Sequence, residues 1–248
     1  MNTLIYQELI RRRTRDEKSL AVLIDPDKSG EAHLRRLLSE SNLPHIDFIF
    51  VGGSLLTSGN MHDTVCTIRS ICTKPIVIFP GDANQIDSEA DAILLLSLIS
   101  GRNPELLIGK HVTSAIHLKR SGLEIISTGY MLIDGGVETT ASYVTGTSPL
   151  PSNKPGIAAM TGLAGEQLGL KVLYMDAGSG AREPVPASLI HAVRSQVSIP
   201  IIVGGGIRNK KGILEAWNAG ADVVVIGNAL EENPELLPQL RAELIGSA

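Results

Sequence analysis

Short, continuous runs of apolar residues alternate along the chain with longer stretches that have the spacing of amphipathic helices. Eight of the apolar runs have the length of a strand: Leu20–Ile24, Ile46–Val51, Ile76–Phe79, Ala92–Ile99, Glu124–Ile133, Lys171–Met175, Ile201–Val203 and Asp222–Ile226. Strands that are apolar throughout are typical of a parallel sheet covered by helices. Eight of them, each followed by a crossover, predict an α/β fold and, within it, a (β/α)8 TIM barrel.

The crossovers have helical spacing at Glu31–Glu40, Pro104–Ser121, Ala158–Leu168, Ala187–Gln196 and Lys210–Asn218. An extra N-terminal helix is predicted over Thr3–Arg13, ahead of the first strand. The third crossover, Gly81–Ala90, is polar and acidic, so its helix is expected to be short or irregular. No linker rich in Pro or Ser divides the chain, and residues 1–248 are expected to form a single barrel domain.

One connecting segment is unusually long. Asp134–Pro155 follows the fifth strand and is rich in Gly, Thr, Ser and Pro. The loops after barrel strands carry active sites, and a long segment without regular structure is otherwise uncommon. This segment is therefore predicted to be an active-site lid, with an ordinary surface loop as the alternative.

Composition and charge narrow the possible functions. Hydrophobic residues make up 43% of the chain and charged residues 19%, which is enough for a large core. A net charge of −4 gives no electrostatic footprint for nucleic acid, so a phosphate group must be recognised locally. Cys66 and Cys72 have the spacing of neither a zinc site nor a disulfide framework. No run has the length of a membrane span or a signal peptide, and we expect a cytoplasmic protein.

Three glycine-rich segments stand in the last third of the sequence. Each follows an apolar run and precedes a helical pattern, at Tyr174–Ala181, Val203–Arg208 and Ile226–Ala229. Glycine lets backbone N–H groups approach an anion, and the N-terminus of the following helix adds a favourable dipole. Because two such loops after the last barrel strands are a recurrent phosphate site, the sequence predicts binding of a phosphorylated small molecule.

Two carboxylates flank a proline where the first strand ends, in Asp25-Pro26-Asp27. Mg²⁺ is usually held by one or two carboxylates and takes its other ligands from water and substrate phosphates. Asp25 is therefore a candidate metal ligand, and Ser54, which follows the second strand, offers a hydroxyl to a metal or a phosphate. For Asp27 the alternative is a turn that caps the next helix.

Asp176 ends the sixth strand, beside the first glycine-rich segment. A carboxylate there could accept a proton from a hydroxyl of the phosphorylated substrate, an effect typically worth about 10²–10⁴-fold in rate. The alternative is a carboxylate that only organises the loop by hydrogen bonds. Tyr130 and Tyr174 are candidates for the pocket wall or for core positions with satisfied hydroxyls.

Six motifs occur in one order over nearly the whole chain. They are Leu-Ile-Asp-Pro-Asp-Lys, Val-Gly-Gly-Ser, Thr-Gly-Tyr-Met-Leu-Ile, Tyr-Met-Asp-Ala-Gly-Ser-Gly, Val-Gly-Gly-Gly-Ile-Arg and Ile-Gly-Asn-Ala. Each is weak alone, but together they resemble the geranylgeranylglyceryl phosphate synthase family, in particular its second group. The related heptaprenylglyceryl phosphate synthases have the same scaffold.

The resemblance implies a Mg²⁺-dependent prenyltransferase. Such an enzyme joins the 3-hydroxyl of sn-glycerol 1-phosphate to a polyprenyl diphosphate, here expected to be geranylgeranyl diphosphate. The implied residues are Asp25 and Ser54 for the metal, Asp176 as the catalytic base, and for glycerol phosphate Tyr174, Met175, Asp176, Ala177, Gly178, Ser179, Gly180, Gly205, Gly206, Gly227 and Asn228. The family commonly has Glu where this chain has Asp176, so the base is one methylene shorter.

The same resemblance implies partners. A prenyl tail needs an apolar groove on the barrel top, because each buried CH₂ contributes about 0.8 kcal/mol. Lipid substrates imply transient contact with a membrane surface, and a homo-oligomer is expected because family members form dimers and larger assemblies.

Two other interpretations stay open. An isomerase or aldolase of a phosphorylated metabolite usually needs a lysine, or a paired acid and base, at the strand ends, and only Lys28 lies near such an end. A barrel that only binds a phosphorylated ligand has no use for carboxylates such as Asp25 and Asp176 near a phosphate.

Overall fold

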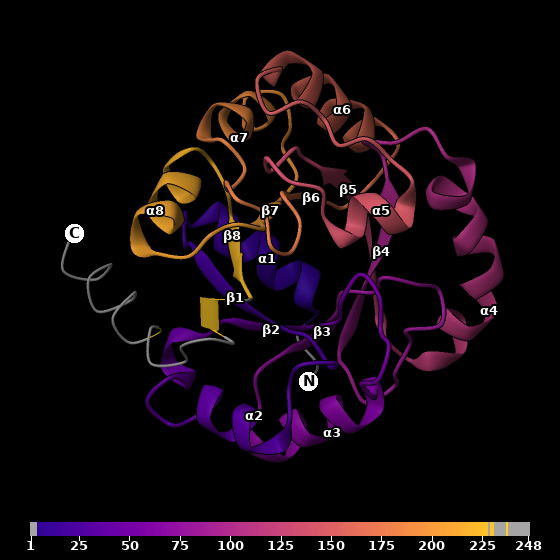
Figure 1. Cartoon of the computed structure of the whole chain (residues 1–248), viewed down its shortest axis with the longest axis vertical. Helices are drawn as coiled ribbons and strands as arrows, with labels where there is room; N and C mark the ends of the chain where they lie inside the picture. The colour runs from indigo at the N-terminus through magenta and orange to yellow at the C-terminus, as the bar shows by residue number, and fades with distance from the viewer. Residues whose placement is uncertain (1–3, 228, 231–236, 238–248) are drawn as a thin grey trace.

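Eight parallel strands close into a barrel in the computed structural model, which describes residues 4–227, 229–230 and 237 (Figure 1). Each strand pairs with the next one in sequence, and β8 pairs with β1. The strands are β1 (Ser19–Ile24), β2 (Phe48–Val51), β3 (Ile76–Ile78), β4 (Ala92–Leu98), β5 (Glu124–Leu132), β6 (Val172–Asp176), β7 (Ile201–Gly204) and β8 (Val223–Ile226). The predicted (β/α)8 barrel is confirmed, and every observed strand overlaps the apolar run predicted for it.

Most of the helices form an outer ring around the strands, and the first helix lies across one end of the barrel instead (Figure 1). They are α1 (Ile5–Thr14), α2 (Glu31–Leu37), α3 (Met61–Ile71), α4 (Lys110–Ser121), α5 (Thr140–Thr145), α6 (Pro155–Gln167), α7 (Ala187–Arg194) and α8 (Lys210–Asn218), with a 3-10 turn η1 (Leu43–His45) and a π turn η2 (Glu105–Gly109). One helix was predicted over Pro104–Ser121, and the structure divides it into η2 and α4. None of the described helices is both long and apolar enough to cross a bilayer.

Side chains along each strand alternate between the barrel interior and the layer beneath the helices. On β6, Val172 and Tyr174 pack in the interior, whereas Leu173 and Met175 pack under the helices. The same alternation turns Asp176, the last residue of β6, toward the interior at the C-terminal end of the barrel. The direction of the Asp176 side chain is therefore set by the two-residue alternation of β6 and not by a flexible loop.

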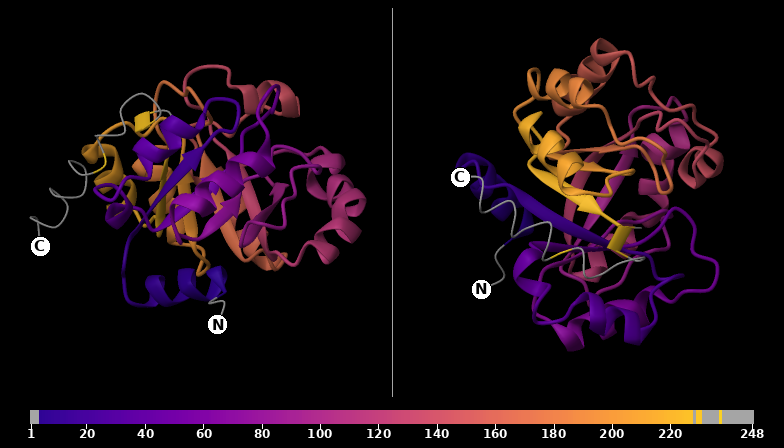
Figure 2. Two further views of the ribbon diagram at one scale, coloured as in Figure 1. Left: turned by 90° about the horizontal axis from the view of Figure 1, so that it is seen from below. Right: turned by 60° about the vertical axis from the view of Figure 1, so that its left-hand side comes forward.

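Helix α1 closes the opposite end of the barrel, as Figure 2 shows. Its residues Ile5 and Leu9 are buried against the interior core. The carboxylate of Glu124, at the start of β5, accepts hydrogen bonds from the backbone N–H groups of Ile5 (2.5 Å) and Tyr6 (3.1 Å). Glu124 thus satisfies free donors at the N-terminus of α1, where a negative charge is favourable. The predicted extra helix is confirmed, and it covers this end of the barrel interior.

The third crossover departs from the regular barrel. Within residues 79–91, all of which the structure describes, the chain forms turns and bends and no helix connects β3 to β4. The expectation of a short or irregular helix was close, but the segment has no helix at all because its polar residues offer no apolar face to pack on the barrel. The outer ring is therefore interrupted between α3 and α4.

Candidate active site

A polar cavity lies at the C-terminal ends of the strands, opposite α1. Its wall includes Asp25, Ser54, Tyr174, Asp176, Gly178, Ser179, Gly180, Gly205, Gly206 and Gly227, ten of the predicted site residues. Two further candidates do not line it: Met175 faces the helices, and Ala177 is buried behind the wall. Asn228 lies outside the described residues. The fold thus gathers residues from β1, β2, β6, β7 and β8 into one site.

The glycine-rich loops after β6 and β7 approach each other too closely for a side chain. Gly205 has φ +80°, and a Cβ there would lie 2.6 Å from Asp176 Oδ1 and 2.6 Å from the backbone N of Gly178. At Gly206, with φ +70°, a Cβ would lie 2.8 Å from the carbonyl group of Glu183. Both positions need glycine for its backbone conformation and for its lack of a side chain. The result is a backbone-lined cradle suited to a phosphate group.

Arg208, which follows β7, forms hydrogen bonds to the loop after β6. Its guanidinium donates hydrogen bonds to the backbone oxygens of Ala181 (2.6 Å) and Arg182 (3.1 Å), and its side chain also lines the polar cavity. The loop after β6 is held from its other side too, because the N–H groups of Arg182 and Glu183 donate to the carbonyl of Gly135. Arg208 was present in the glycine-rich motif, but nothing in the sequence indicated its partners.

Asp176 is the most deeply buried carboxylate of the site, with 7% of the residue exposed. Its Oδ2 accepts a hydrogen bond from the hydroxyl of Tyr130 (2.7 Å), and its Oδ1 accepts one from the N–H of Gly178 (2.8 Å). Burial raises the pKa of Asp176 above its ordinary value, and the two hydrogen bonds oppose the rise. Burial and the neighbouring negative charge also raise the pKa of Tyr130, which keeps its hydroxyl a donor.

Three aromatic rings stand beside this carboxylate. Phe79 stacks on Tyr174 with ring centroids 4.7 Å apart, and Tyr130 lies 5.8–6.0 Å from both. Tyr174 lines the polar cavity, whereas Tyr130 lines a second, apolar cavity. The two tyrosines are therefore wall residues rather than purely core residues, and Phe79 is a wall residue that the sequence did not single out.

The two carboxylates after β1 have different surroundings. Asp27 accepts hydrogen bonds from the backbone N–H groups of Thr57, Ser58 and Gly59 and from the Thr57 hydroxyl. These bonds hold its pKa well below the usual range and occupy its oxygens. The prediction that Asp27 caps the next helix is wrong, because α2 begins at Glu31 and the carboxylate instead fixes the loop after β2.

Asp25 lines the polar cavity, as Asp27 does, but it accepts fewer hydrogen bonds. Its Oδ1 accepts a hydrogen bond from the N–H of Asp27 (3.0 Å), and its Oδ2 lies 3.5 Å from Lys28 Nζ. Gly53, next to Ser54, approaches it so closely that a Cβ would lie 3.3 Å from Oδ1. No group of three or more His, Cys, Asp or Glu side chains suited to a metal occurs among the residues that the structure describes. A cation here would therefore take most of its ligands from water or substrate.

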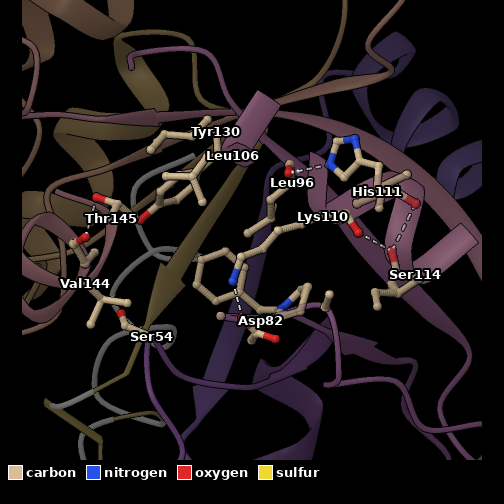
Figure 3. A pocket seen from close by; sticks show the side chains of 18 of the residues that line it. Ser54, Asp82, Leu96, Leu106, Lys110, His111, Ser114, Tyr130, Val144 and Thr145 are labelled. Atoms are coloured by element: carbon tan, nitrogen blue, oxygen red, sulfur yellow. Dashed lines mark hydrogen bonds and ion pairs between the residues drawn. The ribbon is translucent and has the colours of Figure 1, made fainter. Parts of the chain in front are cut away.

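An apolar groove adjoins the polar cavity, and Gly53, Ser54 and Phe79 line both. Figure 3 shows it between the residues after β3 and the inner face of α4. Most of its wall is aliphatic, from Ile86, Ile93, Leu95, Leu96, Leu98, Leu106 and Leu118. The groove lies where the third crossover lacks a helix. The polar sequence of Gly81–Ala90 had indicated that the helix there would be irregular, but it had not indicated the groove.

The predicted lid segment covers both spaces. It contains α5, which begins with a capping box between Thr139 and Ser142. Thr140 lines the polar cavity, and Ala141, Val144 and Thr145 line the apolar groove. The segment therefore lies at the active-site face as expected, although it is partly helical; its opening stays a prediction.

A phosphate cradle, a buried carboxylate and an adjoining apolar groove define a (β/α)8 barrel that can hold a phosphorylated molecule beside an apolar chain. The model of the PcrB family matches residues 12–243, and the chain belongs to this family.

Two relatives and one solved structure that are similar to this chain are named geranylgeranylglyceryl phosphate synthase. Geranylgeranylglyceryl phosphate synthase of Chitinophaga pinensis is 51% identical over 97% of this chain and 95% of its own length. The protein of the same name from Spirosoma linguale is 54% identical over 90% of each chain. The crystal structure of (S)-3-O-geranylgeranylglyceryl phosphate synthase from Thermoplasma acidophilum, in complex with its substrate sn-glycerol-1-phosphate, matches with a TM-score of 0.89 at 30% identity and covers 97% of this chain and 98% of its own. The resemblance found in the sequence is confirmed.

Proposed function

We propose that this protein is a prenyltransferase that joins the 3-hydroxyl of sn-glycerol 1-phosphate to a polyprenyl diphosphate, with geranylgeranyl diphosphate as the expected donor. The observation that carries the proposal is the junction of the two cavities at Gly53, Ser54 and Phe79. A phosphate in the cradle and an apolar chain in the groove place their reacting ends at this junction, near Asp176. The similar proteins from Chitinophaga pinensis and Spirosoma linguale are named for this activity.

In the reaction, the glycerol oxygen forms a bond to the first carbon of the prenyl chain while the bond from that carbon to diphosphate breaks. The proton of the hydroxyl passes to Asp176, which the hydrogen bonds from Tyr130 and Gly178 hold in position. The cradle holds the acceptor in a fixed orientation, so less translational and rotational entropy is lost in the reaction step. This effect can remove several kcal/mol from the activation barrier. The raised pKa of Asp176 brings its basicity closer to that of a useful proton acceptor.

We also propose that Mg²⁺ binds at Asp25, with Ser54 beside it. The donor set fits, because one carboxylate plus substrate phosphates is a common arrangement for this ion. Asp27 is excluded as a second ligand by the four hydrogen bonds that occupy its carboxylate. When bound there, the ion would neutralise charge on the leaving diphosphate. Asp25 holds its position through the hydrogen bond from the N–H of Asp27.

The other interpretations of the sequence account for less of the structure. A sugar-phosphate isomerase or aldolase has no use for a long aliphatic groove beside the cradle. A barrel that only binds phosphate has no use for a buried carboxylate, since a negative charge next to a phosphate opposes binding. No observation in the structure favours either one.

A product assay by mass spectrometry tests the proposal. The protein is mixed with Mg²⁺, prenyl diphosphates of several lengths, and either sn-glycerol 1-phosphate or sn-glycerol 3-phosphate as the control acceptor. We expect a prenylglyceryl phosphate from the 1-phosphate only. The absence of product at every chain length, with glycerol phosphate still bound, would overturn the proposal.

The Asp176→Asn variant tests the role of the base. We expect it to retain binding of sn-glycerol 1-phosphate in a calorimetric titration and to lose turnover by roughly 10²–10⁴-fold. Unchanged turnover would show that Asp176 only organises the loop. The same turnover assay tests the proposed metal site, with Mg²⁺ first removed by a chelator and then added back.

We further propose that two copies associate through the outer surface of η2, α4 and α6. Exposed apolar side chains gather there: Ile108, Val112, Ile116, Ile157, Met160 and Leu168. A shallow groove lined by Leu107, Ile157 and Met160 joins η2 to α6, and contiguous exposed apolar surface of this kind marks interaction sites. Light scattering after size exclusion should report a dimer for the wild type and a monomer for Ile157→Lys/Met160→Lys. A monomeric wild type would contradict this assignment.

Contact with a bilayer and a cytoplasmic location complete the proposal. A substrate with a prenyl tail resides in a membrane, and Cys66 and Cys72 are both free thiols, as is usual in a reducing compartment. In a co-sedimentation experiment, vesicles that contain the prenyl diphosphate donor should capture more of the protein than vesicles that lack it. Equal capture would count against a substrate-driven contact.

A further inference from the structure

Opposite walls of the apolar groove are joined by a salt bridge. One wall is the segment after β3, with Asp82, Ala83 and Ile86, and the other is α4, with Lys110 and Ser114. The ammonium group of Lys110, the first residue of α4, is bonded to the Asp82 carboxylate across the groove, as Figure 3 shows. The attraction of Lys110 also lowers the pKa of Asp82.

This salt bridge is a solitary connection. Among the residues the structure describes, no other hydrogen bond or ion pair links residues 80–91 to residues 104–121. The segment after β3 is instead anchored to α3 on its far side. His62 Nδ1 lies 2.8 Å from Asp87 Oδ2, and Arg69 donates to the backbone oxygen of Glu89 (3.1 Å). On the other wall, His111 Nε2 lies 2.8 Å from the backbone oxygen of Leu96 and holds α4 on β4. Opening the salt bridge would therefore part the two side chains across the groove while both walls remain anchored.

The position of the bridge decides how a long chain can reach the groove. Ser54 and Phe79 stand at the junction with the polar cavity, whereas Ile93 and Leu118 belong to the part beneath the helix layer. A chain that extends from the junction along α4 has to pass beneath the bridge between Asp82 and Lys110. Threading it there end-first would require an extended conformation throughout entry, which is entropically unfavourable for a flexible chain.

We propose that the Asp82–Lys110 pair is a clasp, which opens to admit the prenyl chain sideways into the groove and closes over it during the reaction. The inference rests on the proposed function, since it concerns the donor of that reaction. Both side chains are half exposed, at 44% for Asp82 and 41% for Lys110, and an ion pair in such a position contributes little net free energy. The pair can therefore open readily while still retaining a bound chain by blocking its way out.

A reversible cross-link between the two positions tests the clasp. In an Asp82→Cys/Lys110→Cys variant, a short bis-thiosulfonate reagent ties the walls together, and dithiothreitol releases them. We expect cross-linking to lower turnover of added geranylgeranyl diphosphate at least tenfold, with full recovery on reduction and unchanged binding of sn-glycerol 1-phosphate. Turnover that matches the reagent-treated Asp82→Cys control would overturn the proposal, because the donor would then enter with the clasp shut.

A second set of variants separates the clasp from a general structural role. Lys110→Met removes the pair and should raise the KM for the donor several-fold, with faster release of a fluorescent prenyl analogue and little change in the KM for the acceptor. The reversed pair Asp82→Lys/Lys110→Asp should restore the wild-type donor KM. Failure of the reversed pair, together with an unchanged analogue release rate in Lys110→Met, would sink the idea. If the wild-type protein has no prenyltransferase activity, that result would contradict the proposed function and not the clasp.

Discussion

At Asp176, burial and hydrogen bonding act on one carboxylate in opposite directions. Burial raises its pKa, and the hydrogen bonds from Tyr130 and Gly178 lower it. A base must be ionised to accept a proton, so activity is lost as the pH falls through this raised pKa. The acidic limb of kcat/KM therefore lies at higher pH than the ordinary aspartate value of about 3.9 would give.

Replacing Tyr130 with Phe removes one of the two stabilising hydrogen bonds from the ionised form. The pKa of Asp176 then rises further, and we expect the acidic limb of kcat/KM to move to higher pH. The plateau rate above the limb should stay within several-fold of wild type. A pH profile at saturating donor measures both quantities, with Tyr6→Phe at the far end of the barrel as the control. A limb that stays in place would show that Tyr130 does not tune the base.

Gly205 offers a test of the close approach between the two loops. In Gly205→Ala the new Cβ would lie 2.6 Å from Asp176 Oδ1, and the residue would also keep a strained φ of +80°. Gly169→Ala is a matched control, because its φ is +85° and nothing lies within 4 Å of the added Cβ. Gly169→Ala should lose about 1–2 kcal/mol of stability from its strained φ, and Gly205→Ala should show a larger drop in Tm because its Cβ also collides with backbone atoms. Only Gly205→Ala should lose activity, by roughly 10²-fold, since a displaced base misses its target.

Asp25 and Asp27 show how far single residues can be interpreted from sequence. Both carboxylates follow β1 and flank one proline; the sequence favoured Asp25 as the metal ligand and left Asp27 open between a ligand and a cap on the next helix. The structure separates them, because Asp27 meets Thr57, thirty positions further along the chain, as well as the residues after it. Such contacts depend on how β1 and β2 come together in the barrel, which local pattern does not encode.

Among the elements, the loops after β6 and β7 act as a pair because Arg208 ties one to the other. Arg208→Met should loosen the cradle and raise the KM for sn-glycerol 1-phosphate by roughly tenfold, the equivalent of about 1.4 kcal/mol. The kcat and the KM for the donor should change little, because Asp176 has its own supports. Steady-state kinetics with each substrate varied measure this split. Arg182→Met is the control, because Arg208 bonds to the backbone oxygen of Arg182 and not to its side chain. Equal effects in the two variants would contradict the role assigned to Arg208.

The predictability of the elements follows from their burial. All eight strands could be predicted, since each is apolar enough to be covered on both faces. The six-residue α5 was missed, because so short a helix in a polar segment rests on its capping box and on the groove beneath it. The glycine-rich loops revealed the cradle, but not the hydrogen bond between Tyr130 and Asp176, whose partners are 46 residues apart.

On the scale of the whole molecule, one missing helix creates the apolar groove. The barrel interior is filled by side chains and closed by α1 at one end, so it offers no room for a long chain. The ring of helices is interrupted after β3, and there the outer face of β4 and the inner face of α4 form an aliphatic channel. The fold thus places a polar and an apolar site side by side at the active-site end.

The length of that channel should limit the donor. Ser114 is buried on the inner face of α4 and lines the groove beyond Lys110. In Ser114→Phe the ring would fill the channel, so we expect competition assays with donors of several lengths to shift toward the shorter ones. Ser114→Ala, and Ala115→Phe on the exposed side of the same helix, should keep the wild-type preference, and Tm should confirm that all three fold. An unchanged preference in Ser114→Phe would mean that the prenyl chain lies elsewhere on the barrel.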